Sequence, residues 1–152
     1  MNENAGRIKD EFAINGLLEA LTKALHDKKA RALIALLSND AVAFDLAPPL
    51  QLGPNVMHDP APLEEWFATW RGPIASTPFH RTIVVGGDVA YAYGLQHMTG
   101  TKVDGENADL WFRTTACFSR EGERWLITHM HNSVPFAMDG TDKALVDLKP
   151  QS

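Results

Sequence analysis

Two histidines, an arginine and a serine lie close together near the C-terminal end of the sequence. The stretch from Asp109 to Pro135 is predicted to form two long strands joined by a turn at residues 120–123. Because side chains alternate across a strand, one face of the second strand carries Trp125, Ile127, His129, His131 and Ser133. One face of the first strand carries Trp111, Arg113, Thr115 and Cys117. If the two faces coincide, these groups share one concavity.

The two histidines have two interpretations. Residues two apart on a strand point the same way, so His129 and His131 could bind a metal if His97 or His80 supplied a third ligand. A strand with His-x-His and no carboxylate at a suitable spacing favours another interpretation. One histidine is then a hydrogen-bonded core group and the other, His131, is an acid or base facing a pocket. We therefore expect no metal and no cofactor.

Arg113 lies between Trp111 and Thr115 on the first of these strands. If its face points outward, the guanidinium is only a solvated charge. If its face points inward, the charge needs a partner, because an isolated buried charge is costly. That partner would be Asp45, Asp109 or the carboxylate of a ligand. The core-like residues that continue this face favour the inward orientation.

Asp45 ends a predicted strand, residues 41–46, just before two prolines. As a structural residue, it would cap the turn by accepting hydrogen bonds from nearby backbone N–H groups. As a functional residue, it would be a general base in apolar surroundings. The sequence leaves both interpretations open.

The four tryptophans are candidates for the lining of an apolar pocket. Trp66 and Trp70 are four residues apart on a predicted helix, and Trp111 and Trp125 are on strands. Trp125 is expected in the core, and the other three are expected to line the pocket. Cys117 lies in an apolar strand and is expected to be a buried structural thiol.

Helices in the first half and strands in the second must position these residues. Helices are predicted at 7–26, 29–37 and 63–71 from their apolar periodicity. A short return strand is expected at 50–53, and a loop at 54–60. Strands are predicted at 76–85 and 89–100, followed by the two strands of the stretch from Asp109 to Pro135. This order indicates an α+β fold with a mainly antiparallel sheet curved around three helices.

The composition limits the possible functions. The chain has 152 residues and a net charge of −5, with no basic cluster, which argues against nucleic acid as a partner. A single cysteine excludes an internal disulfide, and no apolar run is long enough to span a membrane. We expect one cytoplasmic domain over residues 1–152, with 137–152 as a C-terminal tail. The sheet face that the helices leave open predicts a homodimer.

Two strings resemble a known superfamily: KALHDKKARALIALLSNDAVAFD at 23–45 and RTTACFSREGERWLITHMHNSVP at 113–135. They are similar to SnoaL-like and ketosteroid-isomerase-like members of the nuclear-transport-factor-like superfamily. The resemblance implies a cystatin-like cone. It also implies a range of functions, from isomerases, cyclases, dehydratases and hydrolases to proteins that only bind or dimerise.

The resemblance assigns the isomerase general base to Asp45. The family's oxyanion-binding tyrosine would fall at Leu21, and its protonated acid near Thr114 or Thr115. Neither group is present, so steroid isomerisation itself is not expected.

The expected function is a cone that binds a small apolar ligand. If the protein is an enzyme, it is a cofactor-independent isomerase or lyase. Its catalytic residues would be Asp45 and His131. Its substrate-binding residues would be Trp66, Trp70, Trp111, Arg113, His129 and Ser133. The alternative is a non-catalytic binding or dimerisation module.

Overall fold

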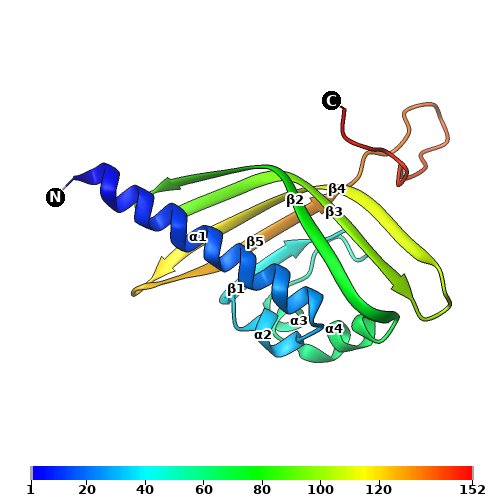
Figure 1. Ribbon diagram of the computed structural model, residues 1–152, viewed down its shortest axis with the longest axis horizontal. Coiled ribbons are helices and arrows are strands. Elements are labelled where there is room, and N and C mark those ends of the chain that lie inside the picture. Colours follow the sequence, from blue (N-terminus) through cyan, green and yellow to red (C-terminus); the bar gives the residue numbers. More distant parts are fainter. Residues whose placement is uncertain (1, 152) are drawn as a thin grey trace.

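The computed structural model describes residues 2–151 and has an α+β fold, as predicted (Figure 1). Its helices are α1 (Glu3–His26), α2 (Ala30–Ile34), α3 (Pro54–Met57) and α4 (Pro60–Phe67). Its strands are β1 (Leu37–Phe44), β2 (Trp70–Gly86), β3 (Val89–Lys102), β4 (Asn107–Glu121) and β5 (Arg124–Ser133). The helices lie on one side of a single curved sheet, which confirms the predicted cone (Figure 1).

The five strands form one sheet in the order β1-β5-β4-β3-β2. Strands β2 to β5 form the predicted antiparallel meander, and β1 pairs with β5 in parallel. Strands β1 and β2 are therefore the two edges of the sheet. A parallel neighbour places the end of β1, with Asp45 after it, beside the last residues of β5.

The core lies between α1 and the face of the sheet that we call the inner face. Ile14 and Leu18 of α1 are buried against Ala92, Phe118 and Ile127 of the sheet. A second buried cluster joins the short helices to the start of β2. We call the opposite face, which no helix within residues 2–151 covers, the outer face.

Several element boundaries differ from the prediction. Helix α1 begins four residues earlier, at Glu3, because the side chain of Asn2 accepts a hydrogen bond from the Asn4 N–H and caps it. Helix α2 ends at Ile34, and Leu37 already pairs with β5. The segment predicted as a loop contains α3, and the expected return strand is reduced to a single bridge between Ala43 and Leu52.

The third predicted helix is α4, which ends at Phe67, so Trp70 and Arg71 belong to a strand. Gly72 and Pro73, which directly follow the predicted helix 63–71, lie within β2. The pairing of β2 with β3 is irregular between Arg71 and Ala75. An edge strand tolerates proline at such an irregularity because no neighbour needs its missing N–H.

A β-bulge in β5 changes which side chains reach the inner face. Cys117 pairs with His129, whereas the next residue of β4, Phe118, pairs with Ile127. Thr128 is therefore an extra residue without a partner on β4. The bulge reverses the alternation after Ile127, so Ile127 faces inward and His129 faces outward. The predicted single face from Trp125 to Ser133 is wrong for this reason.

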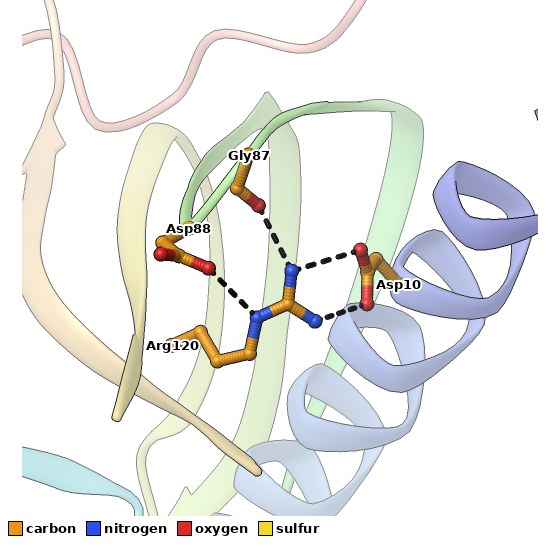
Figure 2. Close-up of polar contacts among 4 residues, drawn as sticks. All are labelled: Asp10, Gly87, Asp88 and Arg120. Carbon is orange, nitrogen blue, oxygen red and sulfur yellow. Dashed lines mark hydrogen bonds and ion pairs between the residues drawn. The ribbon is translucent and has the colours of Figure 1, made fainter. Parts of the chain in front are cut away.

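Arg120 of β4 ties the sheet to the N-terminal half of α1. Its guanidinium donates two hydrogen bonds to the Asp10 carboxylate, at 2.7 and 3.3 Å, and others to Asp88 Oδ1 and the Gly87 carbonyl (Figure 2). It also stacks over the Trp125 ring at 4.8 Å. The hydrogen bonds to the Asp10 and Asp88 carboxylates raise the pKa of Arg120. One side chain thus joins α1, the β2–β3 turn and the core.

We predict that Arg120→Met lowers the urea midpoint of unfolding. The methionine keeps part of the contact with Trp125 but leaves the Asp10 carboxylate, which is only 16% exposed, without its partner. The matched control is Arg71→Met, because Arg71 is exposed and donates only one long hydrogen bond, at 3.3 Å to Val103. Equal midpoints for the two variants would contradict the role of Arg120.

Residues 134–151 follow β5 and contain no helix or further strand. The Leu145 N–H donates to the Pro135 carbonyl, and Phe136 forms a bridge with Ala144, so the segment folds back on itself. It leaves on the side of the sheet opposite α1 (Figure 1). Within residues 2–151, no helix has the length and apolar content that crossing a membrane requires.

Candidate functional site

Asp45 lies at the end of β1, and two hydrogen bonds fix its carboxylate. Its Oδ1 accepts from the Leu46 N–H at 2.7 Å and from the side-chain amide of Asn132 at 3.2 Å. The side chain of Asp45 is exposed. The backbone bond is the turn cap that the sequence allowed. The Asn132 contact joins the ends of β1 and β5 at the side chains.

Asn132 is the residue that sequence analysis missed. The bulge at Thr128 places it on the inner face, where it pairs with Thr114 of β4. Its Nδ2 carries a second hydrogen, and its Oδ1 is buried with no hydrogen-bond partner among residues 2–151. A buried acceptor without a partner costs free energy, so an O–H group that donates a hydrogen bond to Asn132 Oδ1 would be favoured there.

Two further buried polar atoms lack partners among the described residues, and both lie near the short helices. His58 donates from Nδ1 to the Pro54 carbonyl at 2.8 Å, and its buried Nε2 has no hydrogen-bond partner. The indole Nε1 of Trp70 is a buried donor without an acceptor. The side of the molecule that carries the helices therefore offers both donors and acceptors.

The two helix-region tryptophans are in different environments. Trp70 is 4% exposed and packs with Phe67 and Ile74 in the second core cluster. Trp66 is 37% exposed, and its ring centroid lies 5.6 Å from that of Trp70 in an edge-to-face arrangement. Trp66 is thus the one of the pair with surface available to a ligand.

The other predicted site residues lie together on the outer face. Trp111, Arg113, His129, His131 and Ser133 all belong to the alternation that points away from α1. The His129 Nδ1–H donates to the Val42 carbonyl at 2.7 Å, and the His129 and His131 ring centroids are 6.4 Å apart.

Arg113 does not face inward, contrary to the prediction. Its side chain is exposed, and its Nε–H donates to the Ser133 hydroxyl at 3.1 Å rather than to a carboxylate. His131 is exposed on the same face. The expected arrangement, in which Arg113 and His131 face Asp45 across one cone, is therefore not formed within the chain.

An aromatic cluster continues the outer face toward the end of β3. The His97 ring stacks on Trp111 with centroids 4.2 Å apart, and its Nε2–H donates to Asp109 at 2.6 Å. This hydrogen bond lowers the pKa of Asp109. Nowhere in residues 2–151 do three His, Cys, Asp or Glu side chains gather closely enough to hold a metal ion.

Cys117 lies on the outer face next to the bulge and is unpaired and partly buried. Burial raises the pKa of its thiol, so the reactive thiolate is disfavoured. Its side chain helps to line an open hollow of about 600 Å³ on the outer face, together with Asp40, Tyr91 and Thr128. A second hollow, of about 580 Å³, lies between α1 and β2. Asp45 lines neither of them.

The sequence matches the SnoaL-like domain family over residues 14–137, from the core half of α1 to the residues after β5. The chain belongs to this family. The match includes Asp45, Asn132 and all five strands. No curated protein matches the chain.

Many solved structures are similar to this SnoaL-like protein, and three of them are described next. An NTF2-like protein of unknown function from Pseudomonas putida KT2440 is 32% identical, with a TM-score of 0.82 and coverage of 94% of this chain and 98% of the other. A proposed calcium/calmodulin-dependent protein kinase II association domain from Xanthomonas campestris is 20% identical (TM-score 0.68; 84% and 87% covered). A proposed dehydratase of the NTF2-like family from Streptomyces avermitilis is 14% identical (TM-score 0.74; 86% and 99% covered).

The structure also shows how the isomerase pattern maps onto this SnoaL-like domain. Leu21, at the position of the family's tyrosine, packs against the main core cluster and offers no hydrogen-bonding group. Of the two candidates for the second acid, Thr114 is on the inner face beside Asn132 and Thr115 is on the outer face. Asp45, Asn132 and Thr114 are therefore polar groups that lie near one another at this end of the inner face.

Proposed function

We propose that this protein binds a small, largely apolar organic molecule at the end of the cone marked by Asp45 and Asn132. The observation that supports the proposal is the contact between the two side chains. The side-chain amide of Asn132 donates one N–H to the Asp45 carboxylate. Its other N–H and its buried Oδ1 have no partner among the described residues. A ligand with a carbonyl or hydroxyl group would complete these hydrogen bonds, and Trp66 would contact its apolar part.

The chemistry that this arrangement supports best is cofactor-free proton transfer. Asp45 takes a proton from the carbon next to a ligand carbonyl, and the amide of Asn132 donates a hydrogen bond to the oxygen on which negative charge develops. In a ligand with a C=C bond next to the carbon that loses the proton, return of the proton to the far end of that bond moves the double bond and completes an isomerisation. Loss of a neighbouring hydroxyl as water, with the same proton, completes a dehydration. The similarity to a proposed dehydratase is in keeping with this class of reaction.

A deuterium-exchange assay tests the proposal without knowledge of the natural substrate. Apolar cyclic ketones and enones are incubated with the protein in D2O, and the loss of the proton signal next to the carbonyl is followed by ¹H NMR. We expect at least one compound to exchange faster than in buffer containing heat-denatured protein. If a broad panel exchanged no faster with the folded protein, the non-catalytic alternative would be favoured.

The second function that an observation favours is dimerisation through the outer face. Exposed apolar and aromatic side chains gather there on three strands, β1, β2 and β3: Phe44, Val84, Val89, Tyr91 and Tyr93. Tyr91 and Tyr93 stack at 6.2 Å and are 45% and 47% exposed. Such a patch is typical of an interface. The similarity to a proposed association domain is in keeping with a protein that assembles.

We predict that the wild-type protein is a dimer at micromolar concentration and that Tyr93→Glu weakens the dimer by about 100-fold or more. The substitution removes an aromatic contact and buries a charge in the interface. Phe12→Glu is the control, because Phe12 is 80% exposed but lies on α1, away from the outer face. Sedimentation equilibrium measures both variants. A monomeric wild type, or equal dissociation constants for the two variants, would contradict the proposed interface.

The roles proposed for the outer-face residues follow from this interface. We propose that His129, His131, Arg113, Ser133 and Trp111 contribute to contacts between subunits rather than to the Asp45 site of their own chain. The protein has one cysteine and it is unpaired, so a reducing compartment is compatible with its structure and we propose the cytoplasm.

A further inference from the structure

A groove of about 580 Å³ runs between helix α1 and the edge strand β2. Five polar residues of α1 form one side of it: Asn15, Glu19, Thr22, Lys23 and His26. Pro78 and Arg81 of β2 form the other side. Because β1 and β2 are opposite edges of the sheet, this groove is separate from the site at Asp45.

Arg81 is a half-buried charge without a partner. Its guanidinium makes no hydrogen bond and no ion pair with any residue in the described range 2–151, although it carries five N–H donors. Burial lowers the pKa of Arg81, which shows that its surroundings disfavour the charge. A charge that is partly removed from water gains from a partner, and the lack of one within residues 2–151 points to an anion from outside the chain.

The backbone of β2 is distorted where Arg81 lies. Phe79 pairs with Leu95 and Thr82 pairs with Tyr93, so His80 and Arg81 lie opposite the single residue Gly94. His80 has a φ of 54°, a conformation that costs a non-glycine residue free energy. Bulges of this kind turn a side chain toward a new direction, and here Arg81 lines the groove beside α1.

Gly94 is required for this bulge. A Cβ at position 94 would lie 3.0 Å from the His80 carbonyl oxygen and 3.1 Å from the Cα of Arg81. Both neighbours are backbone atoms, which cannot move aside cheaply. The strained residue and the glycine opposite it thus hold Arg81 in one place, as a preformed binding group needs.

The other charges in the groove are largely satisfied. Lys23 and His26 both bond the Asp27 carboxylate, at 2.6 and 2.9 Å, and these bonds lower the pKa of Asp27 to about 2. Glu19 is near enough for its charge to act on Arg81, but its carboxylate accepts from the Asn15 amide at 3.1 Å and forms no ion pair with Arg81. The guanidinium remains available.

We propose that the groove between α1 and β2 is a binding site for a small oxyanion, a carboxylate or phosphate group, held by the guanidinium of Arg81. A guanidinium binds either group through two parallel N–H···O bonds. The side-chain amide of Asn15 bonds Glu19 through one N–H and can supply a further hydrogen bond from α1 through the other. The Thr22 hydroxyl already donates to the Leu18 carbonyl. Glu19 opposes the binding of an anion by its charge, so the site selects compact anions that reach Arg81 directly.

The test is a titration of the ¹⁵N-labelled protein with sodium phosphate and, separately, sodium acetate, both against sodium chloride at constant ionic strength. We expect shifts at Thr22 and Arg81 and a dissociation constant of about a millimolar for such small ligands. Arg81→Gln should weaken binding by about tenfold or more. Arg31→Gln, which removes an exposed arginine of α2, should change it less than twofold.

Each arm of the titration distinguishes an outcome. Binding of phosphate alone identifies a phosphate-bearing ligand, and binding of acetate alone identifies a carboxylate. Glu19→Gln should tighten binding, because it removes the opposing charge. The proposal is overturned if neither phosphate nor acetate causes larger chemical-shift changes than chloride does. It is also overturned if the Arg81→Gln and Arg31→Gln variants bind the anion with equal dissociation constants. If Arg81→Gln did not fold, unchanged or weaker binding by folded Glu19→Gln would overturn it as well.

Discussion

Replacing Asp45 with asparagine is expected to lower the rate of deuterium exchange into an accepted ketone by about 10² to 10⁴-fold. The amide keeps the shape of the side chain and can still accept the Leu46 N–H. It cannot take a proton from carbon. Because the turn cap is kept, the loss should appear in the exchange rate and not in the urea midpoint.

Asp40→Asn is the matched control for this change. Asp40 lies on β1, the strand that Asp45 directly follows, and carries the same charge, but it lines the hollow on the outer face and accepts from the Ser38 hydroxyl. We expect its exchange rate to stay within about twofold of the wild type, since it is remote from the proposed reacting carbon. Equal losses in the two variants would mean that charge in general, and not Asp45, controls the reaction.

Phe118→Ala is expected to lower the free energy of unfolding by about 3 to 5 kcal/mol. Phe118 is 1% exposed and lies in the main core beside the bulge of β5, where it pairs with Ile127. Truncation leaves a cavity between the sheet and α1 that a five-stranded sheet cannot easily close. Urea denaturation followed by circular dichroism measures the change.

The control for this loss is an exposed phenylalanine of α1. Phe12 is 80% exposed, so Phe12→Ala removes the same atoms without opening a cavity and should change the free energy of unfolding by less than about 0.5 kcal/mol. If the two variants unfolded at the same urea concentration, the inner face would not be the core of the protein.

The strands of the second half could be predicted from the sequence because their signals are local. The turn at Gly86 to Asp88 and the turn before Arg124 were both placed correctly, and the meander between them follows from short connections. The end of α4 was harder. Trp66 and Trp70 have helical spacing, yet Trp70 starts a strand because its ring packs closely over Gly100 of β3.

The faces of the strands could not be predicted, since one extra residue decides them. Counting by twos places Trp125 and His131 together, and the bulge at Thr128 separates them. Nothing in the sequence around Thr128 marks a bulge. Asn132 was overlooked for the same reason, because simple alternation assigned it to the face opposite the histidines. The second bulge, at His80 and Arg81, was equally invisible, although Gly94 within a strand was a usable signal.

The two faces of the sheet therefore have different proposed roles. Asp45 and Asn132 belong to the inner face, and the histidines, Arg113 and the tyrosines belong to the outer face. This division explains why the histidines and Arg113, whose side chains looked most suited to catalysis in the sequence, do not surround the Asp45 carboxylate. It also makes the ligand site and the dimer interface separable by mutation.

The most direct test of the central claim locates the ligand. A ketone that shows exchange is titrated into the ¹⁵N-labelled protein, and the shifts are compared at the side-chain amide of Asn132 and at the ring nitrogens of His131. We predict that the Asn132 amide signal shifts as ketone is added and that the His131 signals do not. The dissociation constant from the Asn132 shifts should match the ketone concentration that gives half of the maximal exchange rate. Shifts at His131 without any at Asn132 would place the ligand on the outer face and contradict the proposed site.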